Sequence, residues 1–236
     1  MKPYQQIPIL ECSEPLVSIT SENFALENPH PYQKLGAPYH NSKADSPYYL
    51  REGVRDSLMV AKTQLQQNHP PWKILIFDAY RPVEVQQFMV DYTFAEIAQA
   101  QGCELPVSEE KRQVILEKVY QFWAVPSLDR ATPPPHSTGG ALDVTLVDEN
   151  HQKIDMGSPI DEISERSYPD YFASSNEPQE QQYHRHRQIL KDVMIAAGFQ
   201  QHPHEWWHFC LGDQMWAWLT NQQHGRSEVI ARYGRY

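Results

Sequence analysis

The sequence predicts an α+β fold, in which helices flank a central antiparallel sheet within one domain. Two kinds of apolar pattern predict this class. Some stretches repeat apolar residues at the spacing of an amphipathic helix, and others show the alternation or the compact apolar run of a strand. With 236 residues the chain can bury a sizeable core, so we expect a single domain over residues 1–236.

The N-terminal region differs in composition from the rest of the chain. Residues 1–50 are rich in Pro, Asn and Tyr and contain only short apolar pieces. We expect an extended segment that wraps around the domain, with short strands in it. Apolar residues from Val54 to Leu65 then recur at helical spacing, which predicts a helix over about residues 51–67.

A buried strand followed by a helix is predicted next. Residues 73–78 form a compact apolar run after two prolines, which is typical of a buried strand. Pro82 suits the first position of a helix, and we expect this helix to reach about Gln101, just before Gly102. Arg81 therefore lies at a strand-to-helix junction, where side chains commonly face a cleft.

The middle of the chain predicts one more helix and one more strand. Ser108 precedes two acidic residues, a capping arrangement that predicts a helix over about residues 108–122. Apolar and polar residues alternate over 141–148, which predicts a strand with Asp143 on the face opposite its apolar side chains.

The C-terminal part begins with a stretch that we expect to be a long functional loop, residues 155–178. Apolar residues from Tyr183 onward predict a helix with Gly198 as its C-terminal cap. Two short strands around a turn at Pro203 and a short helix near residues 213–220 complete the expected fold.

Charge and composition argue against several kinds of partner. The 20 basic and 30 acidic residues give a net charge of −10, which disfavours nucleic acid and anionic membranes. No run approaches the roughly 20 apolar residues of a transmembrane helix, and the first residues lack the apolar core of a secretory signal. Cys12, Cys103 and Cys210 are an odd, widely spaced set, so we expect reduced thiols in a cytoplasmic protein.

Three short stretches together supply the parts of a catalytic zinc site: residues 78–82 (Asp-Ala-Tyr-Arg-Pro), 136–143 (His-Ser-Thr-Gly-Gly-Ala-Leu-Asp) and 205–208 (Glu-Trp-Trp-His). A catalytic zinc ion usually takes three protein ligands from His and carboxylate side chains and leaves a fourth position for water. His136, Asp143 and His208 are suitable ligands. The glycines between the first two allow a tight turn that could bring both to one ion.

Glu205 and Arg81 complete the chemistry. A metal ion acidifies its water, and a nearby carboxylate such as Glu205 can shuttle the proton. Arg81 offers a planar cation for charge on a carbonyl oxygen or carboxylate. Each stretch alone would more often be structural, because short motifs give many false positives. Their coincidence in one chain indicates a metallopeptidase.

These stretches resemble the pattern of the D-alanyl-D-alanine dipeptidases of the vancomycin-resistance (VanX-like) type. That family carries Asp-x-Tyr-Arg-Pro, then His-x-x-Gly-x-Ala-x-Asp, then Glu-x-x-His, and all three occur here between residues 78 and 208. The family belongs to a larger group of zinc peptidases that also includes D,D-carboxypeptidases and Hedgehog-like domains. The resemblance implies a Hedgehog/D,D-peptidase-like fold.

The resemblance also implies a role for each motif residue. It implies one Zn²⁺ per chain, with His136, Asp143 and His208 as ligands. It further implies Glu205 as general base and then general acid, and Arg81 as the stabiliser of the tetrahedral intermediate.

A substrate-binding residue follows from the same resemblance. Residues 156–161 and 165–167 look like the family's loop in which an Asp holds the substrate's free amine, which implies this role for Asp161. The best-known members have Ser two residues before the first ligand, where it assists the amine contact. This chain has Pro134 there, which leaves the strictness of the D-Ala-D-Ala preference open.

A different zinc motif overlaps the last stretch. Residues 204–208 (His-Glu-Trp-Trp-His) also fit the His-Glu-x-x-His pattern of zincins, with Glu228 as a possible third ligand. That pattern needs both histidines on one helix. Pro203 and the aromatic residues of the motif favour a strand instead, and this alternative gives His136 and Asp143 no role.

We therefore expect a zinc dipeptidase that hydrolyses D-Ala-D-Ala, or a close dipeptide, in cell-wall precursor turnover. One alternative is a D,D-carboxypeptidase acting on longer peptidoglycan stems, and another is a non-catalytic Hedgehog-like zinc-binding domain. The presence of both Glu205 and Arg81 argues against the latter, since a binding module needs no proton shuttle. The sequence does not distinguish oligomeric states, or resistance from recycling.

Overall fold

The computed structural model describes residues 2–41, 46–104, 106–225 and 228–236. Its centre is a five-stranded sheet in the order β2-β4-β5-β7-β6. All neighbouring pairs are antiparallel except the edge pair β2–β4, which is parallel. The strands are β2 (Ala25–Leu26), β4 (Lys73–Asp78), β5 (Ala141–Val147), β6 (Gln200–Gln201) and β7 (His208–Cys210).

Short elements dominate the N-terminal segment. Two strands pair in a separate small sheet, and three helical turns lie between and around them. These elements are η1 (Pro3–Gln6), β1 (Leu16–Ser18), α1 (Pro31–Lys34), η2 (Tyr39–Asn41) and β3 (Tyr49–Arg51). The segment also runs beside the C-terminus, where the Leu10 and Cys12 amides donate to the Ala231 and Arg232 carbonyls.

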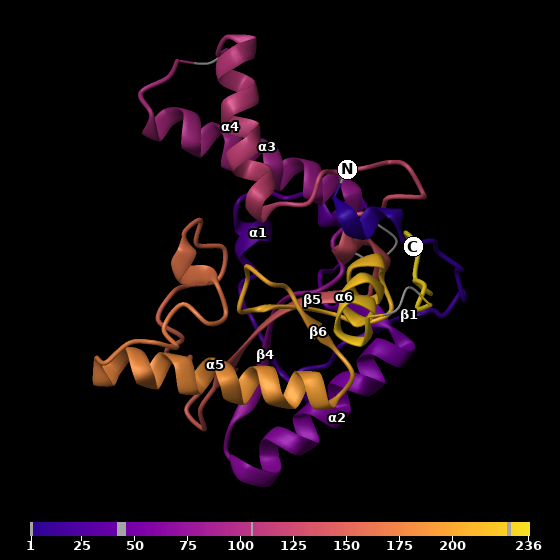
Figure 1. Ribbon diagram of the computed structural model, residues 1–236, viewed down its shortest axis with the longest axis vertical. Helices are drawn as coiled ribbons and strands as arrows, with labels where there is room; N and C mark the ends of the chain where they lie inside the picture. Colours follow the sequence, from indigo (N-terminus) through magenta and orange to yellow (C-terminus); the bar gives the residue numbers. More distant parts are fainter. Residues whose placement is uncertain (1, 42–45, 105, 226–227) are drawn as a thin grey trace.

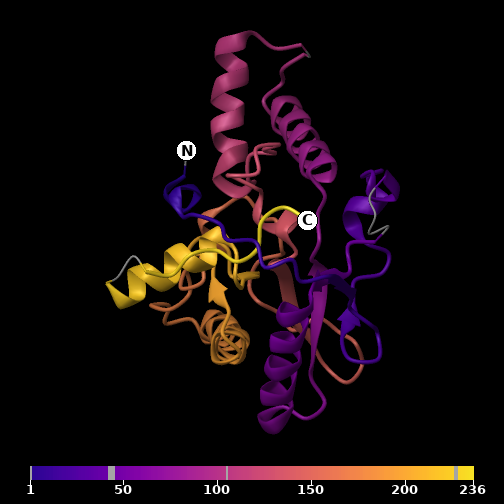
Figure 2. The same cartoon turned by 90° about the vertical axis from the view of Figure 1, so that its right-hand side faces the viewer.

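Longer helices pack around the central sheet (Figures 1 and 2). They are α2 (Glu52–Asn68), α3 (Val83–Ala100), α4 (Glu109–Phe122), α5 (Pro178–Ala196) and α6 (Gln214–His224), with short 3-10 turns η3 (Pro135–Thr138) and η4 (Glu165–Ser167). Helices α3 and α4 form a pair that projects away from the sheet, whereas α2 and α5 contact each other against it. None of the described helices is long and apolar enough to cross a membrane.

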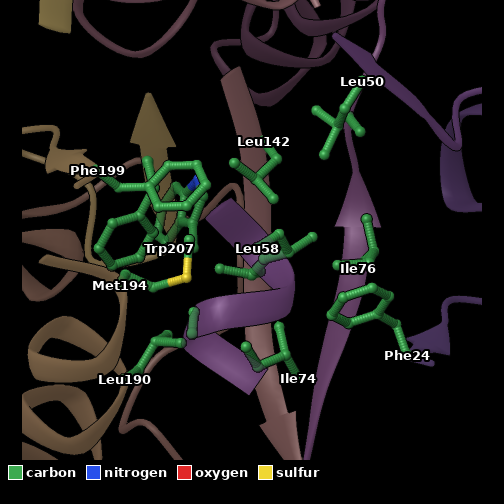
Figure 3. Packing of buried hydrophobic residues seen from close by; sticks show 14 of the residues in the cluster. Phe24, Leu50, Leu58, Ile74, Ile76, Leu142, Leu190, Met194, Phe199 and Trp207 are labelled. Carbon is green, nitrogen blue, oxygen red and sulfur yellow. The ribbon is translucent and has the colours of Figure 1, made fainter. Parts of the chain in front are cut away.

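The main core lies between the sheet and helices α2 and α5. Figure 3 shows Leu58 of α2 with Leu190 and Met194 of α5 beside Ile74 of β4 and Leu142 of β5. All five side chains are fully buried. Burying each aliphatic side chain contributes about 1.5–3 kcal/mol, so this layer holds the sheet to the helices.

Most of the predicted elements are confirmed within one or two residues at each end. Ser108 caps α4 as expected, because its hydroxyl accepts a hydrogen bond from the Lys111 amide at 3.4 Å. Two details of the prediction were wrong. Pro82 is the extended N-cap residue of α3 instead of its first helical residue, and α6 continues to His224.

Strand β5 separates the core from the opposite face of the sheet. Leu142, Val144 and Leu146 belong to the main core, whereas Asp143 and Thr145 point the other way, as their alternation predicts. All seven residues of β5 are buried, so both faces of this strand are covered. A carboxylate on the second face is therefore placed in a site shielded from bulk water.

Candidate metal centre and active site

Strand register brings three polar residues into one row across β4, β5 and β7. Asp78 pairs with Asp143, and Asp143 pairs with His208. Residues directly opposite each other on neighbouring strands share a face of the sheet. The carboxylates and the imidazole therefore gather on the side away from the main core.

His136 reaches the same row from the turn η3. Its Nδ1 atom lies 2.6 Å from the Ala79 carbonyl oxygen, which leaves Nε2 facing the row. The turn ends at Gly139, which has a φ of 71°. A Cβ atom at Gly139 would lie 2.4 Å from the Leu16 side chain, so the turn requires glycine both for its backbone angle and for space.

His136, Asp143 and His208 form a candidate metal centre. Their ligand atoms all lie within 4.8 Å of one another: His136 Nε2 is 3.2 Å from His208 Nδ1, and Asp143 Oδ1 is 3.0 Å from that Nδ1. Two imidazole nitrogens and one carboxylate oxygen are the donor set of a catalytic zinc ion. The contact between His136 Nδ1 and the Ala79 carbonyl is the outer-sphere hydrogen bond that orients a metal-binding histidine.

Charge in this centre favours cation binding. Burial alone would raise the pKa of Asp143, but the neighbouring His136 and His208 hold that pKa far below its usual range. Burial lowers the pKa of His208, which favours its neutral form. An ionised carboxylate beside a neutral imidazole is ready to bind a metal ion without first losing a proton.

Arg81 is buried beside the candidate metal centre and held on several sides. Its Nε donates to Asp78 at 2.8 Å, and its Nη atoms donate to Gln86 at 3.0 Å and to Asp143 at 3.2 Å. The guanidinium also lies 5.1 Å from the ring centre of Tyr32 and 5.0 Å from that of Trp123. These contacts fix its orientation and distinguish it from an exposed helix-start arginine.

Asp78 helps to hold Arg81 in place. Its carboxylate also accepts from the Tyr39 hydroxyl at 2.9 Å and lies 3.2 Å from His30 Nε2. Burial opposes ionisation of Asp78, but the Arg81 guanidinium outweighs it and the pKa falls to about 2. Asp78 is therefore an anion at neutral pH, and its hydrogen bond with Arg81 fixes the position of the guanidinium.

Glu205 lies in the turn before β7, with Oε2 3.8 Å from His208 Nδ1. Burial raises the pKa of Glu205 well above its ordinary value, and the nearby carboxylates Asp143 and Asp161 raise it further. A divalent cation at the candidate metal centre would favour the ionised form. Glu205 can thus both accept and return a proton, which is the requirement for a general base that later acts as an acid.

Asp161 approaches the centre from the loop after β5. It has a φ of 66°, a conformation that Asp tolerates better than most residues, and it accepts a hydrogen bond from the Tyr32 hydroxyl at 2.7 Å. Burial raises the pKa of Asp161 to about 7, with Asp143 adding to the shift. A bound ammonium group would relieve this unfavourable burial, so Asp161 is well placed to receive one.

All the residues singled out from the sequence line one small cavity. They are Arg81, His136, Asp143, Asp161, Glu205 and His208. They come from four separate stretches of the chain, spaced over more than a hundred positions, and the fold brings them together. Such convergence of charged side chains in one cavity is typical of an active site.

The sequence did not predict several other residues that line this cavity or contact its lining residues from behind. Tyr32, Gln86 and Trp123 contact Arg81, and Tyr32 also contacts Asp161. Tyr32 lies in the segment expected only to wrap the domain, and no local pattern sets it apart from the other tyrosines. Only Asp78 had a usable signal, since it begins the first of the three motif stretches.

The zincin alternative is wrong. Residues 202–207 form turns, not a helix, so His204 and His208 do not share a helical face. The exposed His204 packs near Tyr168, with ring centres 4.9 Å apart. Among the described residues, only His136, Asp143 and His208 bring three such ligand atoms together.

The comparisons with known proteins decide the family. The peptidase M15 family, described as D-ala-D-ala dipeptidase, matches residues 27–230. The chain belongs to this family. The resemblance noted in the sequence is thereby confirmed, and membership of the dipeptidase family makes the chain a hydrolytic enzyme.

Relatives named D-alanyl-D-alanine dipeptidase match the whole chain or part of it. A D-alanyl-D-alanine dipeptidase of Synechocystis sp. is 50% identical over 242 residues, which cover 100% of this chain and 97% of that protein. A D-alanyl-D-alanine dipeptidase of Escherichia coli is 35% identical over 139 residues, 59% of this chain and 55% of that protein. The solved structure of the LdcB LD-carboxypeptidase aligns with a TM-score of 0.45 and 14% identity, over 97% of this chain and 85% of that one.

Proposed function

We propose that this chain is a zinc-dependent dipeptidase that hydrolyses D-Ala-D-Ala, or a close dipeptide, to free amino acids. The observation that carries the proposal is the shared cavity, in which the candidate metal ligands, Glu205, Arg81 and Asp161 all meet. The relative that is 50% identical over the whole chain, a D-alanyl-D-alanine dipeptidase, supports the same substrate. We place the reaction in the turnover of cell-wall precursors in the cytoplasm.

His136, Asp143 and His208 would hold one zinc ion. When bound, zinc supplies Lewis acidity, which lowers the pKa of a water molecule and polarises a carbonyl group. Glu205 accepts the proton of the attacking water and returns it to the leaving amine. Arg81 lies at the cavity wall with its guanidinium fixed by Asp78, so it can stabilise negative charge on the carbonyl oxygen without reorganising.

Asp161 is the proposed amine receptor of the cavity, and Tyr32 supports it from behind. The Asp161 carboxylate would pair with the free ammonium group of the dipeptide, and the Tyr32 hydroxyl keeps that carboxylate in place. Where the family has a Ser that assists the amine contact, this chain has Pro134, and the hydroxyl that contacts Asp161 is that of Tyr32. A substrate with a further N-terminal residue would place a neutral amide where the dipeptide has its ammonium group, and the Asp161 carboxylate would be left unpaired.

Product analysis tests the substrate. The zinc-loaded protein should release alanine from D-Ala-D-Ala and should leave L-Ala-L-Ala and a stem pentapeptide largely intact. Release of the terminal D-Ala from the pentapeptide at a comparable kcat/KM would favour a D,D-carboxypeptidase. A protein that binds zinc but cleaves none of the three would favour a non-catalytic binding domain.

Metal analysis tests the ligand set. His136→Ala, Asp143→Ala and His208→Ala should each lose most of the bound zinc, because two protein ligands hold the ion poorly. His204→Ala is the matched control, since this exposed histidine belongs to the rejected motif and should retain zinc. Near-full occupancy in any of the first three variants would remove that residue from the set.

A further inference from the structure

The structure leaves one end of the proposed substrate without an assigned partner. A free dipeptide carries an ammonium group and a carboxylate, and only the ammonium group has a proposed receptor, Asp161. Besides histidine, the cavity lining contains two basic residues, Arg81 and Lys2. Arg81 is held by Asp78, Gln86 and Asp143, and its proposed partner is the carbonyl oxygen of the scissile bond. Lys2 is therefore the cation that remains available for a second anionic group.

The turn η1 fixes Lys2 at the cavity. The Lys2 amide donates to the Gln5 side chain at 2.8 Å, and the Gln5 amide donates back to the Lys2 carbonyl at 3.0 Å. The turn is tied to α6, because Gln214 Nε2 donates to the Ile7 carbonyl at 2.7 Å. Figures 1 and 2 show η1 beside the start of α6, close to the end of α4.

The described part of the chain offers the Lys2 ammonium group no anionic partner. Among the described residues, no carboxylate oxygen lies within 4.0 Å of it. The residue is half-buried, and burial lowers the pKa of its amine, while the more distant Glu205 opposes that shift. A half-buried, unpaired cation at a cavity wall gains most from an anionic ligand.

Lys2 lines a second, outer cavity that Asp161 does not line. A larger outer cavity of about 510 Å³ adjoins the small inner one, and the two share the residues Lys2, Tyr4, Phe122, His202 and Met215. Neither Asp161 nor any of the three candidate metal ligands lines the outer cavity. Lys2 therefore lies where the two cavities meet, whereas Asp161 lines only the inner cavity.

We propose that Lys2 receives the C-terminal carboxylate of the dipeptide, with the substrate lying between Asp161 in the inner cavity and Lys2 where the two cavities meet. The inference rests on the proposed dipeptidase function and makes Lys2 a specificity-determining residue for a free C-terminus. Opposite charges at these two places would select a zwitterion of dipeptide length.

A comparison of two substrates separates this role from an indirect one. Lys2 could instead act only through the charge of Glu205, and in that case its loss would affect every substrate alike. We would measure kcat/KM for D-Ala-D-Ala and for its C-terminal amide with wild type, Lys2→Met and Lys2→Arg. The methionine keeps the apolar stem and removes the charge. Lys111→Met on the exposed face of α4 controls for the change in net charge.

The carboxylate role gives a definite pattern. Lys2→Met should raise KM for D-Ala-D-Ala by about 10-fold or more and leave kcat within about threefold, since it removes one partner of a charge pair. The amide should change little, so the preference for the free dipeptide should collapse. Lys2→Arg should restore most of it, and Lys111→Met should behave as wild type.

Four results would overturn the inference. Equal losses of kcat/KM for the two substrates would show that Lys2 acts through the charge of Glu205. An unchanged KM for the free dipeptide would show that Lys2 has no role in binding it. A wild-type protein that cleaves no dipeptide at all would overturn the proposed function, and this inference with it. An active wild type with an unaltered substrate preference in Lys2→Met would overturn the inference alone.

Discussion

At the scale of single residues, the carboxylate of Asp143 links the candidate metal centre to Arg81. Asp143 directs Oδ1 towards His208 and Oδ2 towards Arg81, at 3.0 Å and 3.2 Å. It therefore contacts both a candidate metal ligand and the group proposed to stabilise the oxyanion. Because the strand fixes its backbone, a change at Asp143 would disturb both partners at once.

Replacement of Glu205 by Gln tests the proton shuttle. Glu205→Gln should keep the fold and the zinc, but an amide cannot accept a proton from water. General acid–base groups contribute about 10²–10⁴-fold, so kcat should fall within that range. Steady-state kinetics with parallel metal analysis make the measurement. A variant within tenfold of wild type would show that another group moves the proton.

The pH dependence of KM tests Asp161. Burial raises the pKa of this carboxyl to about 7, so below that pH its neutral form cannot pair with an ammonium group. A bound dication would offset part of the rise, which places the transition at or below this pH. KM for D-Ala-D-Ala should therefore fall as pH rises from about 5 towards the transition and then level off. In Asp161→Asn, KM should be higher and independent of pH over that interval, and the same slope in both proteins would exclude Asp161.

At the scale of elements, apolar patterns in the sequence predicted the helices and strands that depend on local spacing. The apolar spacing of α2 appears in the sequence because the helix buries one face, and the alternation of β5 appears because only one of its faces joins the apolar core. The amine pocket could not be predicted in this way. Tyr32 and Asp161 meet across 129 positions, in a segment and a loop that have no periodicity of their own. Of these two residues the sequence identified only Asp161, through the resemblance of its loop to that of the family.

Helix α5 holds the loop that carries Asp161. Arg187 is buried and donates from its guanidinium to the carbonyls of Met156, Tyr168 and Arg166, at 2.7, 2.8 and 2.9 Å. It thus replaces the regular hydrogen bonding that this long loop lacks. Arg187 of α5 therefore orders a loop that contains neither a strand nor an α-helix.

Arg187→Met should loosen the loop while sparing the metal centre. It leaves three carbonyls without their donor, at about 1–3 kcal/mol for each group that stays buried. We expect a higher KM for the dipeptide, faster hydrogen exchange over residues 156–168 and unchanged zinc content. Arg185→Met on the same helix is the control, since Arg185 is exposed and contacts only Gln182 in its own helix. Equal effects of both substitutions would contradict this role for Arg187.

At the scale of the whole molecule, the site joins distant parts of the chain. The candidate ligands come from η3, β5 and β7, and the cavity is completed by α3 and the N-terminal turn η1. The order of the elements could be predicted from the sequence, but the meeting of η1 with α6 depends on tertiary contacts such as Gln214 to Ile7. For that reason Lys2 had no signal in the sequence.

Removal of zinc should destabilise the entire fold. An ion that binds only the folded protein adds about 2.7 kcal/mol at a hundred times its Kd. For a chain of this length that corresponds to a rise in Tm of about 5–10 °C. Thermal unfolding of the metal-free and the zinc-loaded protein should show the difference, and His208→Ala should show none. A Tm that does not respond to zinc in the wild type would argue against binding at these ligands.

The most direct test of the account is the preference for a free amine. We would compare kcat/KM of the zinc-loaded protein for D-Ala-D-Ala and for N-acetyl-D-Ala-D-Ala. Acetylation removes the ammonium group and leaves a buried Asp161 unpaired, at about 3–5 kcal/mol. The account predicts a preference of at least about a hundredfold for the free dipeptide, and Asp161→Ala should narrow it. Comparable values for the two substrates in the wild type would contradict the dipeptidase assignment and favour a carboxypeptidase.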